Sequence, residues 1–357
     1  MPSNQDTKSK PTVRDVAREA RVSLATVDRV LNNREGVREA TVKRVRTAIE
    51  KLGYVRDLSA ANLARRRTYR FVFVLPDGKG QFLTGLRQSI DEAVEGQLYD
   101  RVEARKVLIS SRNNTDLVQK LMALDPDEID GLAIMANETP IVRDTIARLK
   151  KQGVAVVSIV SDQPNSDRDH FVGFDNVSAG RTAGTLLGRF VGDRPGRVAV
   201  VVTSMQARDM IERRLGFDSV MAEQFPNLKP LPSIEAYDDP ELAERLTTRC
   251  LRENDNVVAV YSVGASVRGV ADALTSHVSD KRLICVDHEL TDNSRDLLED
   301  GVLDAVINQN TGHLARSALR VMRAICDDAP VIASQEHIRI EILIRENLPK
   351  RHDPNPI

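Results

Sequence analysis

Eight short runs of apolar residues recur after residue 69, and they constrain the fold more than any other feature. They lie at 71–75, 107–109, 132–135, 154–160, 198–202, 257–261, 283–286 and 305–307. Continuous apolar runs are typical of strands buried on both faces, as in parallel sheets. Amphipathic stretches lie between most of them, which predicts βαβ units with helices on both faces. Roughly 280 residues exceed one comfortable sheet, so we expect a doubly wound α/β fold with two sheets in two subdomains.

The N-terminal segment TVRDVAREARVSLATVDRVLN, residues 12–32, predicts two short amphipathic helices joined by a tight turn. Thr12 is the expected N-cap of the first helix, with Asp15 three residues later. Ser23 is the expected N-cap of the second helix, whose buried stripe is Val27, Val30 and Leu31. This layout is typical of a helix-turn-helix DNA-binding domain. The same periodicity also fits two packed helices with no role in DNA binding.

A third helix is expected to end at Gly53, with an apolar face formed by Val42, Val45, Ala48, Ile49 and Leu52. The segment RDLSAANLARRRT, residues 56–68, contains helix-forming residues but little apolar material. A helix this short is marginal alone. We therefore expect it to become ordered only when a partner holds it.

The charge is divided unevenly along the chain. Residues 1–70 carry 17 basic and 8 acidic residues, whereas the remainder carries 34 basic and 44 acidic residues. The overall charge of −1 therefore combines a basic N-terminal part with an acidic remainder. Phosphate neutralisation supplies most of the non-specific affinity for nucleic acid. This division favours DNA binding by the N-terminal helices over a merely solvated charged face.

Polar side chains follow the ends of the predicted strands, where open α/β sheets bind their ligands. The candidates for effector binding at these ends are Asp77, Ser110, Ser161, Asp162, Asp287 and Gln309. Polar residues commonly end strands, so no single one is informative. Together they predict a binding cleft for a polar, hydroxyl-rich small molecule.

Several classes of protein are disfavoured by what the sequence lacks. The first ten residues are polar, unlike a signal peptide, and no apolar run approaches the roughly 18 residues of a membrane span. Three dispersed cysteines, Cys250, Cys285 and Cys326, suit buried thiols in a reducing compartment. Neither a glycine-rich phosphate loop nor a complete zinc signature is present. We expect a cytoplasmic protein with no metal, cofactor or enzymatic activity.

Residues 13–32, with LGY at 52–54, resemble the DNA-binding domain of the lactose-repressor family. The resemblance implies a homodimer whose second helices enter the major groove of a pseudo-palindromic DNA operator. Base-reading positions are matched by Leu24, Ala25 and Arg29, and Arg29 would form a bidentate pair with guanine. Phosphate-contacting positions are matched by Thr12, Ser23, Thr26 and Asn32.

Two residues depart from the family pattern. Asp28 stands where serine is usual, and its carboxylate would orient Arg29, accept from a cytosine amino group or repel phosphate. Arg21 replaces the usual glycine of the turn. We expect either slight strain at Arg21 or a different turn geometry.

Residues 57–64 resemble the hinge helix of the same family. Leu63 matches the leucine that wedges into the minor groove, and Ala60 matches its supporting position. Operator and dimer partner would together order this segment. The alternative is that Leu63 merely caps the following domain.

The chain after residue 69 resembles the periplasmic sugar-binding proteins to which the family's effector domain is related. VGFDNVSAGRTAG at 172–184 places Asp175 at a sugar-contacting position, and MIERRLGF at 210–217 places Arg213 over the ligand. Asp287 and Gln309 match two further contact positions. The segment VGASVRG at 263–269 lacks the asparagine that relatives often have, which leaves a sugar, a polyol or another small polar metabolite open. The tail after Leu348 has no heptad leucines, so a dimer is expected instead of a tetramer.

These inferences predict a tail at 1–10, a helix-turn-helix domain at 11–56, a hinge helix and linker at 57–68, an effector-binding domain at 69–350 and a tail at 351–357. Within the effector-binding domain, one subdomain combines 69–175 with 309–333, and the other combines 176–308 with 334–350. The predicted function is a ligand-responsive transcriptional regulator, a repressor of genes for sugar or polyol metabolism or transport. The alternatives are a sugar-binding transport protein, an enzyme on an α/β scaffold and an architectural DNA protein.

Overall fold

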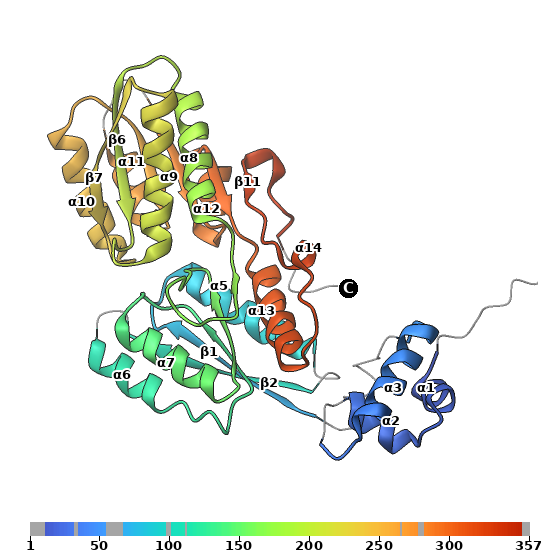
Figure 1. Ribbon diagram of the computed structural model, residues 1–357. Coiled ribbons are helices and arrows are strands. Elements are labelled where there is room, and N and C mark those ends of the chain that lie inside the picture. The colour runs from blue at the N-terminus through green and yellow to red at the C-terminus, as the bar shows by residue number, and fades with distance from the viewer. Residues whose placement is uncertain are drawn as a thin grey trace, which may run out of the picture. The chain divides into compact units, whose positions relative to one another are not determined.

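The computed structural model describes residues 11–31, 35–54, 67–97, 101–110, 113–264, 266–277 and 282–351. The chain divides into two compact units, Met1–Arg67 and Thr68–Ile357, which we call the head unit and the body unit (Figure 1). The predicted tail at 1–10 and hinge residues Ala60 and Leu63 lie outside the described residues, as does Asn32. No helix within the described residues is long and apolar enough to cross a membrane.

The head unit contains three helices, α1 (Val13–Ala20), α2 (Leu24–Leu31) and α3 (Glu39–Leu52). Their buried faces form one small core of Val16, Ala17, Ala20, Val27, Val30, Val45 and Ala48. The start of α1 is held by Thr12, whose backbone amide and hydroxyl both donate to the Asp15 carboxylate. Ser23 Oγ accepts from the amide of Thr26 at 3.1 Å, which caps α2 as the sequence predicts. Gly53 ends α3 in the left-handed conformation.

Arg21 ends α1 in the left-handed conformation that glycine normally supplies, with φ 53° and ψ 50°. The amide of Val22 donates to the carbonyl of Ala17 at 3.1 Å, as in a Schellman turn. The turn therefore keeps the glycine geometry and accepts the strain, which costs roughly 1–2 kcal/mol for a residue with a β-carbon.

The first sheet of the body unit has the strand order β2-β1-β3-β4-β5, and all its strands are parallel. The strands are β1 (Tyr69–Pro76), β2 (Val102–Ile109), β3 (Gly131–Ile134), β4 (Ala155–Ile159) and β5 (His170–Val172). Helices α6 (Asn114–Met122) and α7 (Pro140–Lys151) cover one face. The other face packs on α5 (Gln81–Glu95) and α13 (Thr311–Cys326), which comes from much later in the chain (Figure 1).

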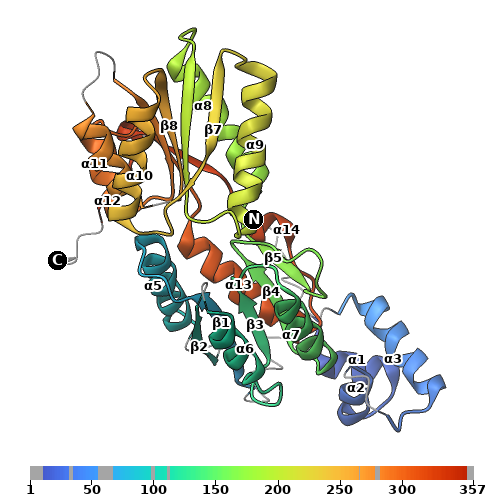
Figure 2. The same cartoon turned by 90° about the vertical axis from the view of Figure 1, so that its left-hand side faces the viewer.

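The second sheet has the order β11-β10-β9-β8-β6-β7, and only β11 runs antiparallel to its neighbour. Its strands are β6 (Gly196–Val202), β7 (Leu228–Glu235), β8 (Val257–Val263), β9 (Ile284–His288), β10 (Ala305–Asn308) and β11 (Glu341–Leu343). Figure 2 shows α8 (Asn176–Val191) and α9 (Arg208–Gln224) on one face. Helices α10 (Pro240–Glu253), α11 (Val267–Ser276) and α12 (Asp292–Glu299) cover the other.

The chain passes between the two sheets three times: after β5, after β10, and between α13 and β11. The short helices α14 (Ala333–Glu336) and η2 (Arg345–Asn347) flank β11, the last strand. The parallel strands therefore present their carboxyl ends where the sheets adjoin. We call this region the junction. Contacts that are described below join the two subdomains there.

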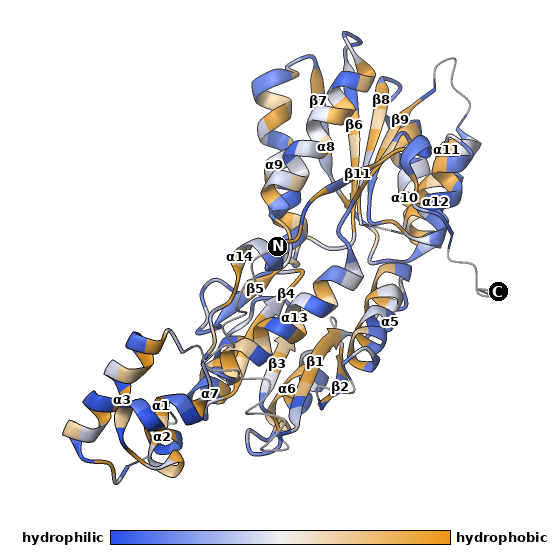
Figure 3. Ribbon diagram, turned by 90° about the vertical axis from the view of Figure 1, so that its right-hand side faces the viewer, coloured by the Kyte–Doolittle hydropathy of each residue, from blue (hydrophilic) through white to orange (hydrophobic). Residues whose placement is uncertain are grey.

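The predicted α/β fold with two sheets is confirmed, and the central strands are the apolar runs of the sequence, as the hydropathy colouring in Figure 3 makes visible. Three strands were not predicted. β5 and β11 have only three residues each, and β7 has the sequence LKPLPSIE, which contains two prolines and no apolar run. All three strands lie at sheet edges, where prolines and a weak apolar pattern are tolerated.

Helices α8 and α9 approach each other closely because glycines face the contact. A β-carbon added at Gly180 would overlap the carbonyl group of Arg213, and one added at Gly216 would overlap the carbonyl of Val177. Gly188 lies similarly against the ring of Phe225. This backbone contact fixes where α9 carries Arg213.

Gly180→Ala is expected to destabilise the body unit by about 1–3 kcal/mol, because the added methyl group would overlap backbone atoms that cannot rotate away. The matched control is Gly85→Ala in α5, where nothing lies within 4 Å of the added carbon. That substitution is expected to be neutral or to stabilise by up to about 1 kcal/mol. Urea unfolding of both variants measures the difference, and equal stabilities would contradict the close contact.

Candidate functional site

The exposed face of α2 carries the predicted base-reading residues. Leu24 is 47% exposed although it is a large apolar residue, and Ala25 and Arg29 are also exposed. Val27 and Val30, on the opposite side of the helix, are buried in the head core. Asp28 is half-buried beside this face. The helix therefore separates a structural side from a side that is available to a partner.

Three of the predicted phosphate-contacting residues, Thr12, Ser23 and Thr26, lie at helix starts, whereas Asn32 lies outside the described residues. Ser23 and Thr26 pair through their hydroxyl oxygens at 2.9 Å. The Thr12 hydroxyl donates to Asp15 at 2.7 Å, and the hydrogen bonds from Thr12 hold the pKa of Asp15 below its usual value. A contact from this hydroxyl to a phosphate therefore requires it to turn away from Asp15.

Arg213 is the centre of a buried polar cluster at the junction, which we define as Asn176, Arg213, Asp287, Glu289 and Gln309. Its side chain is only 1% exposed. Its Nη2 donates to Glu289 Oε1 at 3.0 Å, its Nε donates to Asn176 Oδ1 at 2.9 Å, and its guanidinium lies over the Phe174 ring at 5.2 Å. Gln309 Nε2 donates to the same Glu289 oxygen at 3.0 Å. The cluster therefore joins α9, the end of β9 and two of the segments that connect the sheets.

Burial controls the protonation of the residues at the end of β9. It raises the pKa of Asp287 well above its usual range, against the opposing effects of the Ser262 hydroxyl and the His288 amide. Burial also raises the pKa of Glu289, although Arg213 acts in the opposite direction. The pKa of His288 is lowered by burial and by Arg213, and its Nε2 is 2.8 Å from the hydroxyl of Tyr261.

A chain of hydrogen bonds leads from the cluster to the first sheet. Asn176 Nδ2 donates to the carbonyl of Val160 at 3.2 Å, so the amide of Asn176 connects Arg213 with the end of β4. Val160 has a φ of 64°, which is rare for a β-branched residue. Glu289, at the other end of the chain of bonds, has a φ of 71°. Two strained backbone positions therefore lie at its two ends.

Further contacts close the junction around the cluster. The amide of Asp209, one turn before Arg213 on α9, donates to Ser161 Oγ at 3.4 Å. Arg208 pairs with Glu138 of the other subdomain at 3.2 Å. The amide of Asn293 donates to Gln81 Oε1 at 3.1 Å, and Gly80 lies against the Asp238 carboxylate.

The structure brings together only some of the predicted effector-binding residues. Arg213, Asp287 and Gln309 lie in or beside one buried cluster, and Ser161 contacts α9. Asp162 instead forms an ion pair with Arg168. Hydrogen bonds from Arg168 lower the pKa of Asp162, although burial acts in the opposite direction. Asp175 is exposed and caps α8 through Ser178. Asp77 is exposed after β1, and the amide of Ser110 donates to Asp116.

Sequence reasoning missed Asn176, Asp209 and Glu289. Each lies next to a residue or motif that it did single out: Asn176 follows Asp175, Asp209 precedes MIERRLGF, and Glu289 is two residues beyond Asp287. The only signal was therefore proximity in the sequence. Gly264, in the segment 263–269 that lacks asparagine, has a φ of 66°, and a β-carbon there would lie 3.4 Å from Arg213 Nη1.

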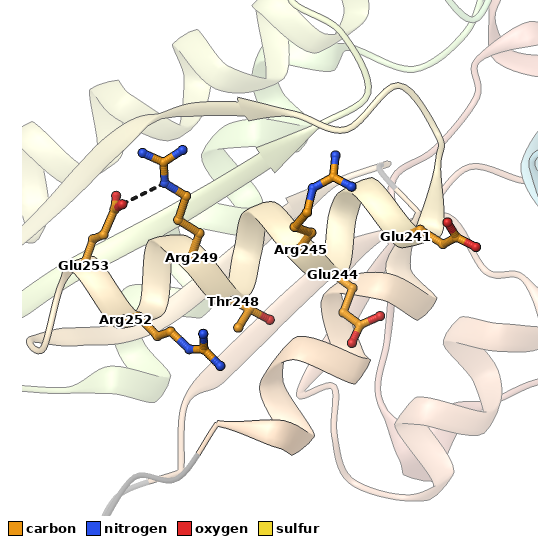
Figure 4. A pocket seen from close by; sticks show the side chains of 7 residues that line it. All are labelled: Glu241, Glu244, Arg245, Thr248, Arg249, Arg252 and Glu253. Carbon is orange, nitrogen blue, oxygen red and sulfur yellow. Dashed lines mark hydrogen bonds and ion pairs between the residues drawn. The ribbon is translucent and has the colours of Figure 1, made fainter.

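Two surface pockets lie away from the cluster. One, of about 570 Å³, is lined by the α10 residues Glu241, Glu244, Arg245, Thr248, Arg249, Arg252 and Glu253. Figure 4 shows these side chains projecting in several directions from a single helix, with Arg249 paired to Glu253. The other pocket includes Arg282 and Asp304, which precede β9 and β10 at the opposite ends of the strands from the cluster. Neither pocket contains a predicted effector-binding residue.

Among the described residues, no group of histidine, cysteine and carboxylate side chains is arranged to hold a metal ion. Cys285 is buried, whereas Cys250 and Cys326 are half-buried, and none of the three forms a disulfide. The cluster itself offers no nucleophile paired with a base. Its chemistry is that of hydrogen bonding and charge pairing.

Asp287→Asn is expected to stabilise the body unit increasingly as pH rises above about 4, the ordinary pKa of aspartate. The raised folded-state pKa means that the unfolded state loses the proton first, so wild-type stability falls with rising pH relative to the variant. Urea unfolding between pH 4.5 and 8 measures this difference. Asp300→Asn removes an exposed carboxylate and controls for net charge. A difference that does not change with pH would contradict the assignment.

Two family models match the chain. Residues 12–57 match the model for bacterial regulatory proteins of the lacI family. Residues 71–330 match a periplasmic binding protein domain. The first match lies in the head unit, and the second lies in the body unit.

Curated relatives with similar sequences are transcriptional regulators. The regulator RegA of Clostridium acetobutylicum is 32% identical over 177 residues, which cover 49% of this chain and 51% of RegA. Catabolite control protein A of Priestia megaterium is 31% identical over 42% of this chain and 43% of its own length. The match thus spans about half or less of these two relatives. The repressor PurR of Proteus mirabilis is 27% identical over 71% of this chain and 72% of PurR.

Solved structures share the fold at low identity. A glucose-galactose binding protein, GanP of Geobacillus stearothermophilus, has a TM-score of 0.70 at 20% identity, over 80% of this chain and all of GanP. A protein of Bacteroides fragilis, solved as a candidate LacI transcriptional regulator, has a TM-score of 0.68 at 17% identity, over 79% of this chain and 98% of that one.

The relatives are regulators and not enzymes, in agreement with the sequence-based expectation. Residues 12–57, in the head unit, match the bacterial regulatory protein model of the lacI family. Over residues 71–330 the chain belongs to the periplasmic binding protein domain family.

Proposed function

We propose that this protein is a DNA-binding transcriptional regulator, a cytoplasmic homodimer that represses transcription from a pseudo-palindromic operator, and that a small polar effector bound at the junction alters its affinity for DNA. The observation that carries this proposal is the buried polar cluster around Arg213. It lies at the carboxyl ends of the strands and includes side chains from two of the segments that connect the subdomains. Ligands of open α/β sheets bind at such strand ends.

The buried oxygen atoms of this region that lack a hydrogen-bond partner favour an effector that donates hydrogen bonds. Within the described residues, six buried side-chain oxygens near the junction have no hydrogen-bond partner: Gln163 Oε1, Asp209 Oδ1, Ser262 Oγ, Asp287 Oδ1, Glu289 Oε2 and Gln309 Oε1. Buried polar atoms are normally paired. Hydroxyl groups of a sugar or polyol would supply the missing donors.

The bonds through Asn176 offer a route from the effector to the rest of the body. An effector that competes for Arg213 or Glu289 changes the bond that holds Asn176 to Val160. Allosteric coupling of about 1–3 kcal/mol corresponds to a change of roughly 5–150-fold in affinity. The effector either releases the operator or promotes its binding, depending on which arrangement of the subdomains it favours.

In the head, Leu24, Ala25 and Arg29 are the proposed base-reading residues, because they form the exposed side of α2. Thr12, Ser23, Thr26 and Asn32 are proposed to contact phosphates. Leu63, supported by Ala60, is proposed to wedge into the minor groove. Asp28, beside Arg29, is proposed to make the preferred half-site unusual for the family.

Arg29→Ala is expected to relax the preference at one base pair of each half-site, with a loss of about 1–3 kcal/mol of discrimination. In vitro selection from random DNA by the full chain identifies the operator, and repeating it with the variant measures the change. Arg18→Ala is the control, because Arg18 is an exposed arginine on α1. An unaltered profile for Arg29→Ala would remove Arg29 from the base-reading residues.

Gln309→Ala is expected to abolish the effector's influence on operator affinity while leaving binding to the operator itself intact. Gln309 touches the cluster without carrying a charge, so its loss leaves no unpaired ion. A thermal-shift screen of neutral sugars, polyols, amino sugars and small acids first identifies an effector. Fluorescence anisotropy with labelled operator, with and without that effector, then gives the response. A normal response from the variant would place the effector elsewhere.

Two other functions are less well supported. A transport role would leave the lacI-family head without a purpose, and specific operator selection by the full chain would exclude it. Turnover of the bound effector would indicate an enzyme, but the cluster contains no paired nucleophile and base.

A further inference from the structure

We infer that Glu289 determines which effectors the junction accepts: its carboxylate occupies the guanidinium of Arg213, so the site admits neutral or cationic hydrogen-bond donors and excludes anions. This inference rests on the proposed effector site. It concerns the charge of the effector, which neither the family models nor the names of the relatives specify.

A buried guanidinium would by itself attract a carboxylate or phosphate, because its planar donors match those groups. Here the chain supplies the carboxylate. Arg213 Nη2 and Glu289 Oε1 are 3.0 Å apart, and their side chains are 1% and 6% exposed. An anionic effector must therefore displace a tethered competitor of the same charge and leave that competitor buried without its partner.

The backbone holds Glu289 in this position. Its amide donates to the carbonyl of Ile307 at 2.8 Å, and its carbonyl accepts from Ser294 Oγ at 2.9 Å. The next amide, of Leu290, donates to Asn308 Oδ1 at 3.0 Å. These bonds maintain the left-handed φ of 71°, a conformation that residues other than glycine rarely adopt. The carboxylate is therefore a fixed part of the site.

The other ionisable groups of the junction point to the same selection. Asp209 and Asp287 are buried carboxyl groups, each with an oxygen that has no partner among the described residues. Asp287 and Glu289 both interact electrostatically with the buried guanidinium of Arg213. Two arginines nearby already hold carboxylates: Arg208 pairs with Glu138 and Glu212, and Arg168 pairs with Asp162. Arg87, near the end of β1, is held by the carbonyl groups of Pro76 and Gly78.

A purely structural role for the Arg213–Glu289 pair would have a different consequence. Removing Glu289 would then lower stability without giving the protein any affinity for anions. Selection by Glu289 predicts instead that its removal creates an anion site at Arg213. The two roles differ in a binding measurement and not only in folding.

The experiment measures the binding of inorganic phosphate to the full-length protein by calorimetry at constant ionic strength. Wild type is expected to bind phosphate only weakly. Glu289→Gln is expected to bind phosphate at least about tenfold more tightly than wild type, since tenfold corresponds to about 1.4 kcal/mol. The double variant Glu289→Gln/Arg213→Gln should lose that binding. Glu299→Gln, which removes an exposed carboxylate paired with Arg351, is the matched control.

A second variant, Glu289→Asp, keeps the charge but shortens the side chain, and it is expected to show intermediate phosphate binding if Glu289→Gln does not fold. Equal phosphate affinity in wild type and a folded Glu289 variant would overturn the inference. So would a screen in which the wild-type effector proves to be an acid or a phosphate ester. Either result leaves effector control of operator binding intact, whereas failure of the proposed function would appear as an operator affinity that no effector changes.

Discussion

The charge of Arg213 is the constraint on which the junction of the body unit depends. It is the largest fully buried side chain among the described residues, and a guanidinium in that position must be neutralised and hydrogen-bonded. Glu289 provides the charge and Asn176 provides a second acceptor. Asn176 also donates to the carbonyl of Val160, just after β4, so a residue that satisfies Arg213 connects it with the first sheet.

The position of that arginine is set by packing elsewhere. Gly180 and Gly216 allow the backbones of α8 and α9 to touch, and their contact places Arg213 against Asn176, the first residue of α8. Gly264, beside the same guanidinium, has a φ of 66°, at which a residue with a β-carbon would be strained. The glycines of this region therefore serve the site as much as the fold, since each allows an approach or a backbone conformation that a β-carbon would disfavour.

The parts of the structure that rest on periodicity could be predicted. The three helices of the head, their caps at Thr12 and Ser23, and the buried central strands all follow from patterns within a few residues. The strands β5, β7 and β11 could not be predicted in this way, because they are short or interrupted and their pairing comes from a sheet that is already formed. Arg21 shows that a residue pattern does not fix a turn: arginine stands where the family usually has glycine, yet the turn has the left-handed conformation that glycine normally supplies.

The sequence by itself determined that a basic helix-turn-helix precedes an α/β body with polar residues at its strand ends, because these are local properties of composition and spacing. Only the tertiary structure decided which polar residues meet. Arg213, Asp287 and Gln309 come together with Asn176 and Glu289, whereas Asp162 and Asp175 are engaged by Arg168 and Ser178. The physical reason is that a buried Arg213 needs partners for its charge and its donors, and those partners, Asn176 and Glu289, lie 37 and 76 residues away in the chain.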